Sequence, residues 1–181
     1  MIIGLTGTMG SGKGEIVRYL KTKGFECHVY SDILREIAKQ RNIEPARANL
    51  QKLGASIKNK SKNKGILSRK LLKKIKTDKA VVDGIRNKDE IAELKKGKET
   101  YIIGVTAPQK LRFKRLRKRK REGDPKTFHE FKKLDNLENR GKTKGQEIND
   151  CLKMADFKVM NNSSIEQLKN KVDKILETIS S

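Results

Sequence analysis

The chain has few of the residues that mark secreted, metal-binding or membrane proteins. Among its 181 residues there is no tryptophan, and the two cysteines, Cys27 and Cys151, do not form a CxxC pair. We therefore expect no disulfide framework and no cysteine-ligated metal, and two reduced thiols in a cytoplasmic protein are the simpler interpretation. No apolar run reaches the roughly 18 to 20 residues of a membrane span, so we expect no membrane partner. The apolar segment 1–5 has no basic flank or cleavage site and is predicted to be a strand.

Acidic residues are scarce relative to basic ones. The chain has 44 Lys or Arg against 22 Asp or Glu, a net charge of +22, and the lysines occur along its whole length. Such a charge attracts polyanions, so nucleotide phosphates and nucleic acid are both candidate partners. A compositional bias toward Lys, Asn and Ile is an equally good explanation. Nucleic acid is not the favoured partner, because the most basic segment lacks the run of interleaved aromatic residues on which successive bases stack.

Strand and helix patterns alternate along the chain. Short apolar runs predict strands, and apolar residues three and four positions apart predict helices. This alternation predicts a three-layer α/β fold, a parallel five-stranded sheet with helices on both faces, in one domain spanning residues 1–181. Ligands bind such sheets at the carboxyl ends of the strands. The predicted strands are 2–6, 25–30, 79–82, 101–106 and 156–160, and the predicted helix starts include caps at Ser31, at Asn87 with Glu90, and at Ser163 with Glu166.

A glycine-rich segment follows the first predicted strand directly. Residues 7–13 read GTMGSGK, which matches GxxxxGK and precedes a helical pattern. Phosphate oxygens need several backbone N–H groups that converge on one point, and glycine lets the chain curl that tightly. The helix N-terminus and Lys13 add positive charge for the β and γ phosphates. The segment therefore predicts an ATP site formed by Gly7, Thr8, Met9, Gly10, Ser11, Gly12, Lys13, Gly14 and Glu15.

The position after the loop lysine departs from the usual pattern. A Ser or Thr hydroxyl normally contacts Mg²⁺ there, but this chain has Gly14 followed by Glu15. Mg²⁺ is expected as a cofactor with ATP, and its ligand from this region is open: Glu15, water molecules or Ser11 are the alternatives.

Four blocks together resemble the P-loop nucleoside monophosphate kinases, the adenylate and cytidylate kinase-like group, across nearly the whole chain. They are residues 7–15, 31–35, 83–86 and 112–125, and the GKGE sequence is similar to an uncharacterised archaeal-type branch of that group. The resemblance implies a P-loop kinase domain with a helical acceptor-binding region at about 36–76 and a small helical lid at about 110–140. The chain is also similar to dephospho-CoA kinase.

The resemblance also implies roles for particular residues. Arg35 and Arg86 would bind the acceptor phosphate, which a guanidinium grips bidentately. Asp83 would hold Mg²⁺ through water. Residues 110–121 contain nine Lys or Arg in twelve positions, and the lid arginines Arg115 and Arg119, with Arg121 as a further candidate, would stabilise the charge on the transferring phosphoryl group. Asp135 is expected to pair with a lid arginine without being catalytic.

The expected reaction is transfer of the ATP γ-phosphoryl to a nucleoside or deoxynucleoside monophosphate. Lys13, Arg115 and Arg119 are then the catalytic residues, and the acceptor phosphate needs no general base. The first alternative is a kinase for a hydroxyl acceptor such as dephospho-CoA, in which Asp32 would take the hydroxyl proton. A nucleic-acid-associated ATPase and a nucleotide-binding protein without catalysis are the others. The partner is a small nucleotide acceptor, and a monomer and a dimer are both open.

Overall fold

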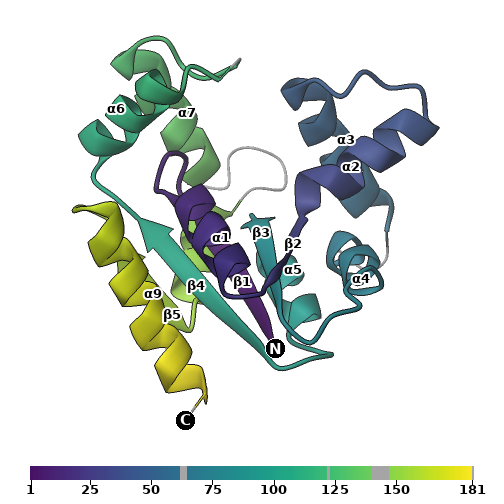
Figure 1. Ribbon diagram of the computed structural model, residues 1–181. Coiled ribbons are helices and arrows are strands. Elements are labelled where there is room, and N and C mark those ends of the chain that lie inside the picture. Colours follow the sequence, from purple (N-terminus) through teal and green to yellow (C-terminus); the bar gives the residue numbers. More distant parts are fainter. Residues whose placement is uncertain (62–64, 122, 140–146, 181) are drawn as a thin grey trace.

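The computed structural model describes residues 1–61, 65–121, 123–139 and 147–180. It contains a sheet of five parallel strands in the order β2-β3-β1-β4-β5, with β1 in the centre (Figure 1). The strands are β1 (Ile2–Gly7), β2 (Glu26–Val29), β3 (Ala80–Ile85), β4 (Thr100–Thr106) and β5 (Phe157–Met160). The helices are α1 (Lys13–Thr22), α2 (Tyr30–Gln40), α3 (Arg47–Lys60), α4 (Ile66–Leu72), α5 (Lys88–Leu94), α6 (Gln109–Arg119), α7 (Phe128–Asn139), α8 (Ile148–Lys153) and α9 (Ile165–Ser180).

Alternate side chains of the central strands enter two separate cores. Ile2 of β1 and Val82 of β3 pack with α2, α4, α5 and α8 on one face. Ile3 and Leu5 of β1 pack with α1 and α9 on the other. Because successive side chains of a strand point to opposite faces, nearly continuous apolar strands require helices on both faces. The predicted three-layer α/β fold is confirmed.

Several boundaries differ from the sequence-based expectation. The third strand was predicted to span residues 79–82, but β3 continues through Asp83 and Gly84 to Ile85. Gly84 has a φ of 90°, and a register shift between Leu5 and Thr6 pairs Thr6 with Ile85. The short helix α8 was not predicted.

The predicted helix caps have mixed outcomes. Helix α2 begins at Tyr30 without a side-chain cap, so the prediction of a Ser31 cap is wrong; the Ser31 hydroxyl accepts a hydrogen bond from Arg35 instead. The Asn87 cap of α5 is confirmed, since its Oδ1 accepts from the Asp89 N–H at 2.8 Å. Ser164, and not Ser163, accepts from a first-turn N–H of α9.

Two helical arms flank the carboxyl end of the sheet. Figure 1 shows α2 and α3 on one side of α1, and α6 and α7 on the other. The first arm has a small core of Ala38, Leu50 and Leu53. The second is packed around the rings of Phe113, Phe128 and Phe131, whose centroids lie 5.4–5.9 Å apart. Helix α3 lies in the segment predicted as the acceptor-binding region, about 36–76, and α6 and α7 lie in the predicted lid region, about 110–140. In the part of the chain that the structure describes, no helix is long and apolar enough to cross a membrane.

Replacing Gly7 by Ala is expected to destabilise the fold strongly. Gly7 has a φ of 143°, and a Cβ there would lie 2.0 Å from the carbonyl oxygen of Val105 in β4. The backbone strain at this φ and the steric clash together predict a loss of about 3 kcal/mol or more in the free energy of unfolding. Gly14→Ala is the matched control: no described atom lies within 4 Å of that Cβ, and alanine in the first turn of α1 should stabilise by about 0.5–1 kcal/mol. Urea unfolding of both variants tests this, and equal effects would contradict it.

Candidate nucleotide site

The loop between β1 and α1 is enclosed by neighbouring backbone and side chains. Gly10 and Gly12 have φ values of 75° and 103°. A Cβ on Gly10 would lie 2.8 Å from the carbonyl oxygen of Arg112, and one on Gly12 would lie 2.1 Å from Nδ2 of Asn161. Both glycines are therefore required for conformation and for space. The loop leads into the N-terminus of the ten-residue helix α1, whose positive dipole end favours an anion.

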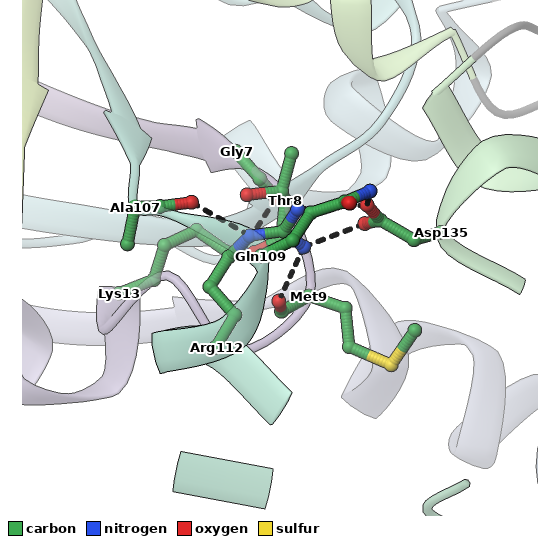
Figure 2. Close-up of polar contacts among 8 residues, drawn as sticks. All are labelled: Gly7, Thr8, Met9, Lys13, Ala107, Gln109, Arg112 and Asp135. Atoms are coloured by element: carbon green, nitrogen blue, oxygen red, sulfur yellow. Dashed lines mark hydrogen bonds and ion pairs between the residues drawn. The ribbon is translucent and has the colours of Figure 1, made fainter. Parts of the chain in front are cut away.

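Arg112 of α6 connects the loop to the second arm (Figure 2). Its Nη1 donates to the Met9 carbonyl at 3.1 Å and its Nε donates to the Ala107 carbonyl at 2.8 Å. Its guanidinium also binds the Asp135 carboxylate of α7 bidentately, at 2.6 and 2.7 Å, and Gln109 donates to the same carboxylate. The two side chains are only 5% and 1% exposed. The expected pairing of Asp135 with an arginine of this segment is confirmed, but the arginine is Arg112, which the sequence did not single out.

Arg115 reaches the same loop from the next turn of α6. Its Nη1 lies 3.5 Å from the Ser11 carbonyl oxygen, and its Nη2 donates to Oδ1 of Asn161 at 3.2 Å. Asn161, at the end of β5, donates to the Ser11 carbonyl at 2.8 Å. Asn161 is not among the site residues predicted from the sequence. Its position directly after a strand, at the edge of the sheet where ligands bind, was the available signal.

Lys13 lies at the centre of the site's charges. Its ammonium donates to the carbonyls of Gly7 and Thr8, at 2.6 and 3.1 Å. Burial lowers the pKa of Lys13 from 10.5 to about 8; Asp83 and Glu138 oppose this shift, and Arg86 and Arg119 add to it. Lys13, Asp83, Arg86 and Arg119, chosen from the sequence, are therefore close enough to interact. Glu138 of α7 was missed.

Asp83 fits the task of holding a hydrated cation. It lies in β3 opposite Leu5 of β1, and its Oδ1 is buried without a hydrogen-bond partner among the described residues. Mg²⁺ is usually held by one or two carboxylates together with substrate phosphates and water, so one carboxylate with an unsatisfied oxygen is suitable. Gly14 offers no hydroxyl and Glu15 forms an ion pair with Arg18. Within the described ranges no three His, Cys, Asp or Glu side chains cluster.

Arg86 is placed by its backbone. Its N–H donates to Oε2 of Glu90 at 2.9 Å, and its carbonyl accepts from the N–H of Glu147 at 2.7 Å. Glu90 is buried and pairs with Lys58 of α3 at 2.6 Å. The side chain of Arg86 is exposed just beyond the carboxyl end of β3. These contacts therefore fix the backbone of Arg86 and leave its guanidinium accessible to a ligand.

The other predicted residues lie in the first turns of α2 and at the C-terminal end of α6. Arg35 of α2 donates to Asp32 at 2.6 Å, and both side chains are exposed. Arg119 binds Asp124 bidentately, at 2.6 and 2.7 Å. The structure thus brings one group of predicted residues together around Lys13 and places Asp32 and Arg35 at the start of α2, directly after β2.

These features define the class of protein: a P-loop, kinase-like, nucleotide-binding α/β protein. The chain matches the family described as AAA domain over residues 3–154. It also belongs to the archaeal UPF0200 family. It is 32% identical to the UPF0200 protein of Hyperthermus butylicus, covering 99% of this chain and 95% of that protein. It is 36% identical to the one from Sulfurisphaera tokodaii, covering 98% and 97%. The expected likeness to an archaeal-type family is confirmed.

Solved structures with a similar fold include kinases. Shikimate kinase from Acinetobacter baumannii, in complex with shikimate, has a TM-score of 0.62 at 16% identity, with 98% of this chain and 93% of that one covered. Deoxyadenosine kinase from M. mycoides has a TM-score of 0.55 at 15% identity, with 98% and 100% covered. At these identities the likeness shows the fold alone.

Removal of Asp135 is expected to destabilise the protein strongly. Asp135→Ala would leave the Arg112 guanidinium buried without its carboxylate, a change that costs about 3–5 kcal/mol. Asp150→Ala removes a carboxylate from an exposed pair with Lys153 at 3.4 Å and should cost at most about 1 kcal/mol. Thermal and urea unfolding compare the two variants. Equal stability of the Asp135 and Asp150 variants would show that the buried pair does not hold α7 to the loop.

ATP affinity is expected to decrease at alkaline pH because Lys13 loses its proton. With a pKa of about 8, Lys13 is charged at lower pH and increasingly neutral above it, whereas the phosphates of ATP are fully ionised there. Affinity should change little near pH 7 and fall above about pH 8, by up to about tenfold per pH unit. Calorimetric titration across this range measures it. Lys13→Arg, whose guanidinium stays protonated, should remove the dependence; an identical fall in that variant would assign it to another group.

Proposed function

We propose that this protein transfers the γ-phosphoryl group of ATP, with Mg²⁺, to a nucleoside or deoxynucleoside monophosphate. The observation that carries the proposal is the set of cations around the phosphate loop: Arg115 of α6 lies 3.5 Å from the Ser11 carbonyl oxygen, and Arg86 and Arg119 interact electrostatically with Lys13. A donor site alone needs the loop and the lysine. Additional guanidinium groups from the end of β3 and from α6 suit a second phosphate that lies beside the first.

The contacts suggest a division of labour between the two arms. Lys13 and the loop N–H groups would hold the β and γ phosphates of the donor. Arg86, which is exposed beyond β3, and Arg35 on α2 would hold the acceptor phosphate. Arg35 is now paired with Asp32, so an incoming phosphate would replace an exposed carboxylate as its partner.

The second arm would supply charge to the transferring group. Arg115 already contacts the Ser11 carbonyl, and Arg119 would exchange Asp124 for phosphate oxygens. Phosphoryl transfer depends mainly on positioning and on preorganised positive charge. The acceptor phosphate is itself an anionic nucleophile, so these residues need to orient it and exclude water, and no side chain has to remove a proton. Bound Mg²⁺ would neutralise charge on the phosphates, and Asp83 would hold it through water.

A hydroxyl acceptor, as in dephospho-CoA kinase, is the second candidate. The position of Asp32 favours it: its carboxylate is exposed in the first turn of α2, directly after β2, and is held by Arg35. Such a carboxylate is suited to accept a hydroxyl proton. Loss of turnover in Asp32→Asn with normal donor affinity would support this candidate, whereas a monophosphate kinase should tolerate that substitution better.

A panel of acceptors tests the proposal directly. ATP and Mg²⁺ are incubated with the protein and each common nucleoside monophosphate, deoxynucleoside monophosphate or dephospho-CoA, and ADP release is followed. Turnover with one or a few monophosphates is expected, and Lys13→Ala should abolish it. Turnover with dephospho-CoA alone would select the second candidate. No turnover with any acceptor, by protein that still binds ATP, would refute the kinase proposal.

Arg35 and Arg86 are expected to act on the acceptor and not on ATP. Arg35→Ala and Arg86→Ala should each raise the KM for the monophosphate about tenfold or more, the value of a charge-assisted hydrogen bond, and leave the KM for ATP nearly unchanged. Arg41→Ala is the matched control, because Arg41 is exposed at the other end of α2. Steady-state kinetics with each substrate varied in turn measures the effect, and an equal rise for ATP would contradict the assignment.

A further inference from the structure

The excess positive charge is concentrated in two segments of the chain. Residues 41–79 contain thirteen Lys or Arg and two Asp or Glu, and residues 109–139 contain twelve and five. All other residues together contain nineteen and fifteen. A compositional bias acting on the whole gene would spread the excess more evenly. The excess is therefore uneven along the chain, and the second of these segments, which forms α6 and α7, lies beside the phosphate loop.

Helix α6 carries one exposed row of cations. Lys110, Lys114 and Arg117 are spaced by four and three residues, which puts them on one face of the helix, and all three are exposed. Helix α6 contains no acidic residue at all. Within the described part of the chain, no ion pair is formed by these three side chains. Like charges three and four residues apart destabilise an isolated helix. The row therefore costs stability, and a binding role for this surface would account for its presence.

The opposite side of α6 is fixed to the phosphate loop. Arg112, two and five positions from members of the row, is buried against Met9 and Asp135. Helical spacing therefore directs Lys110, Lys114 and Arg117 away from the loop and away from ATP bound there. They are unsuited to hold the donor, while their helix is held rigidly beside it.

We propose that the exposed row of α6, Lys110, Lys114 and Arg117, binds the phosphate backbone of a nucleic acid duplex. The row extends for about 10 Å along the helix, which suits a series of regularly spaced phosphates better than one small anion. The one aromatic residue of α6, Phe113, packs against Phe128 and Phe131 and is not exposed as a stacking platform. Binding should therefore be independent of base sequence and should favour a duplex over a single strand.

A membrane surface is a poorer partner for this row. Membrane-binding helices combine a basic face with exposed large apolar residues that enter the lipid. Among the described residues, the exposed large hydrophobic side chains are Leu134, Met154, Met160 and Ile165, none of which is on α6. The proposal concerns a surface outside the catalytic machinery and does not rest on the proposed kinase reaction.

The test compares two triple variants with the same loss of charge. Lys110→Gln/Lys114→Gln/Arg117→Gln removes the row. Lys70→Gln/Lys73→Gln/Lys76→Gln removes three exposed lysines at and just beyond α4. Binding to fluorescein-labelled RNA duplex, DNA duplex and single-stranded RNA is followed by anisotropy at several salt concentrations without ATP. Circular dichroism and ATP titration establish that both variants are folded.

The α6 variant should lose at least about tenfold in duplex affinity, and the slope of log affinity against log salt should become shallower by about 2.7, or about 0.9 for each lost phosphate contact. The α4 variant should stay within about threefold of the unchanged protein, because it removes equal charge from outside the row. Equal losses in both variants would overturn the proposal in favour of diffuse attraction. So would the absence of duplex binding, or α6-dependent binding to anionic phospholipid vesicles without duplex binding. Acceptor turnover is measured separately, so the kinase proposal and this one can fail independently.

Discussion

The path of the backbone between β1 and α1 is the constraint on which the rest of the site depends. A side chain at Gly7 would collide with the Val105 carbonyl of β4, one at Gly10 with the Arg112 carbonyl of α6, and one at Gly12 with Asn161 after β5. Three separate parts of the chain therefore pack onto the loop where side chains are missing. The close approach also lets Arg112, Arg115 and Asn161 donate to the carbonyls of Met9 and Ser11, so contacts from α6 and from the end of β5 hold the loop in place.

The same packing creates the electrostatic character of the site. Lys13 is partly buried, and the guanidinium groups of Arg86 and Arg119 lie close enough to lower its pKa further. Below that pKa the folded protein keeps a charge that burial disfavours. A bound anion would stabilise this charge, and the protein would therefore bind an anion more tightly. The buried Arg112–Asp135 pair is different, because the two charges compensate each other. The pair holds α6 and α7 against the loop and leaves no net charge for a ligand.

Most of the fold was predictable because its patterns are local. The apolar runs of β1, β3 and β4 and the glycine spacing of the loop are visible in short windows of sequence. The errors occurred where a neighbouring element decides the outcome. Ser31 is a good capping residue by type, but Arg35 binds its hydroxyl. Strand β3 passes through Asp83 and Gly84 because β1 shifts register beside it. Helix α8 has six residues, too few for a periodic pattern.

The sequence by itself determined that a phosphate loop follows the central strand and that acidic and basic candidates follow neighbouring strands, because strand, glycine and lysine are contiguous. It did not determine the tasks of the arginines in the basic segment, since nine Lys or Arg in twelve positions are chemically alike. Only the packing of α6 against the loop and α7 separates them. Arg112 is buried and links the loop to α7, whereas Arg115 contacts the loop directly. Arg119 pairs with Asp124, and Arg117 is exposed to solvent. The physical reason is that each turn of a helix has one orientation relative to its neighbours, and those neighbours come from distant parts of the chain.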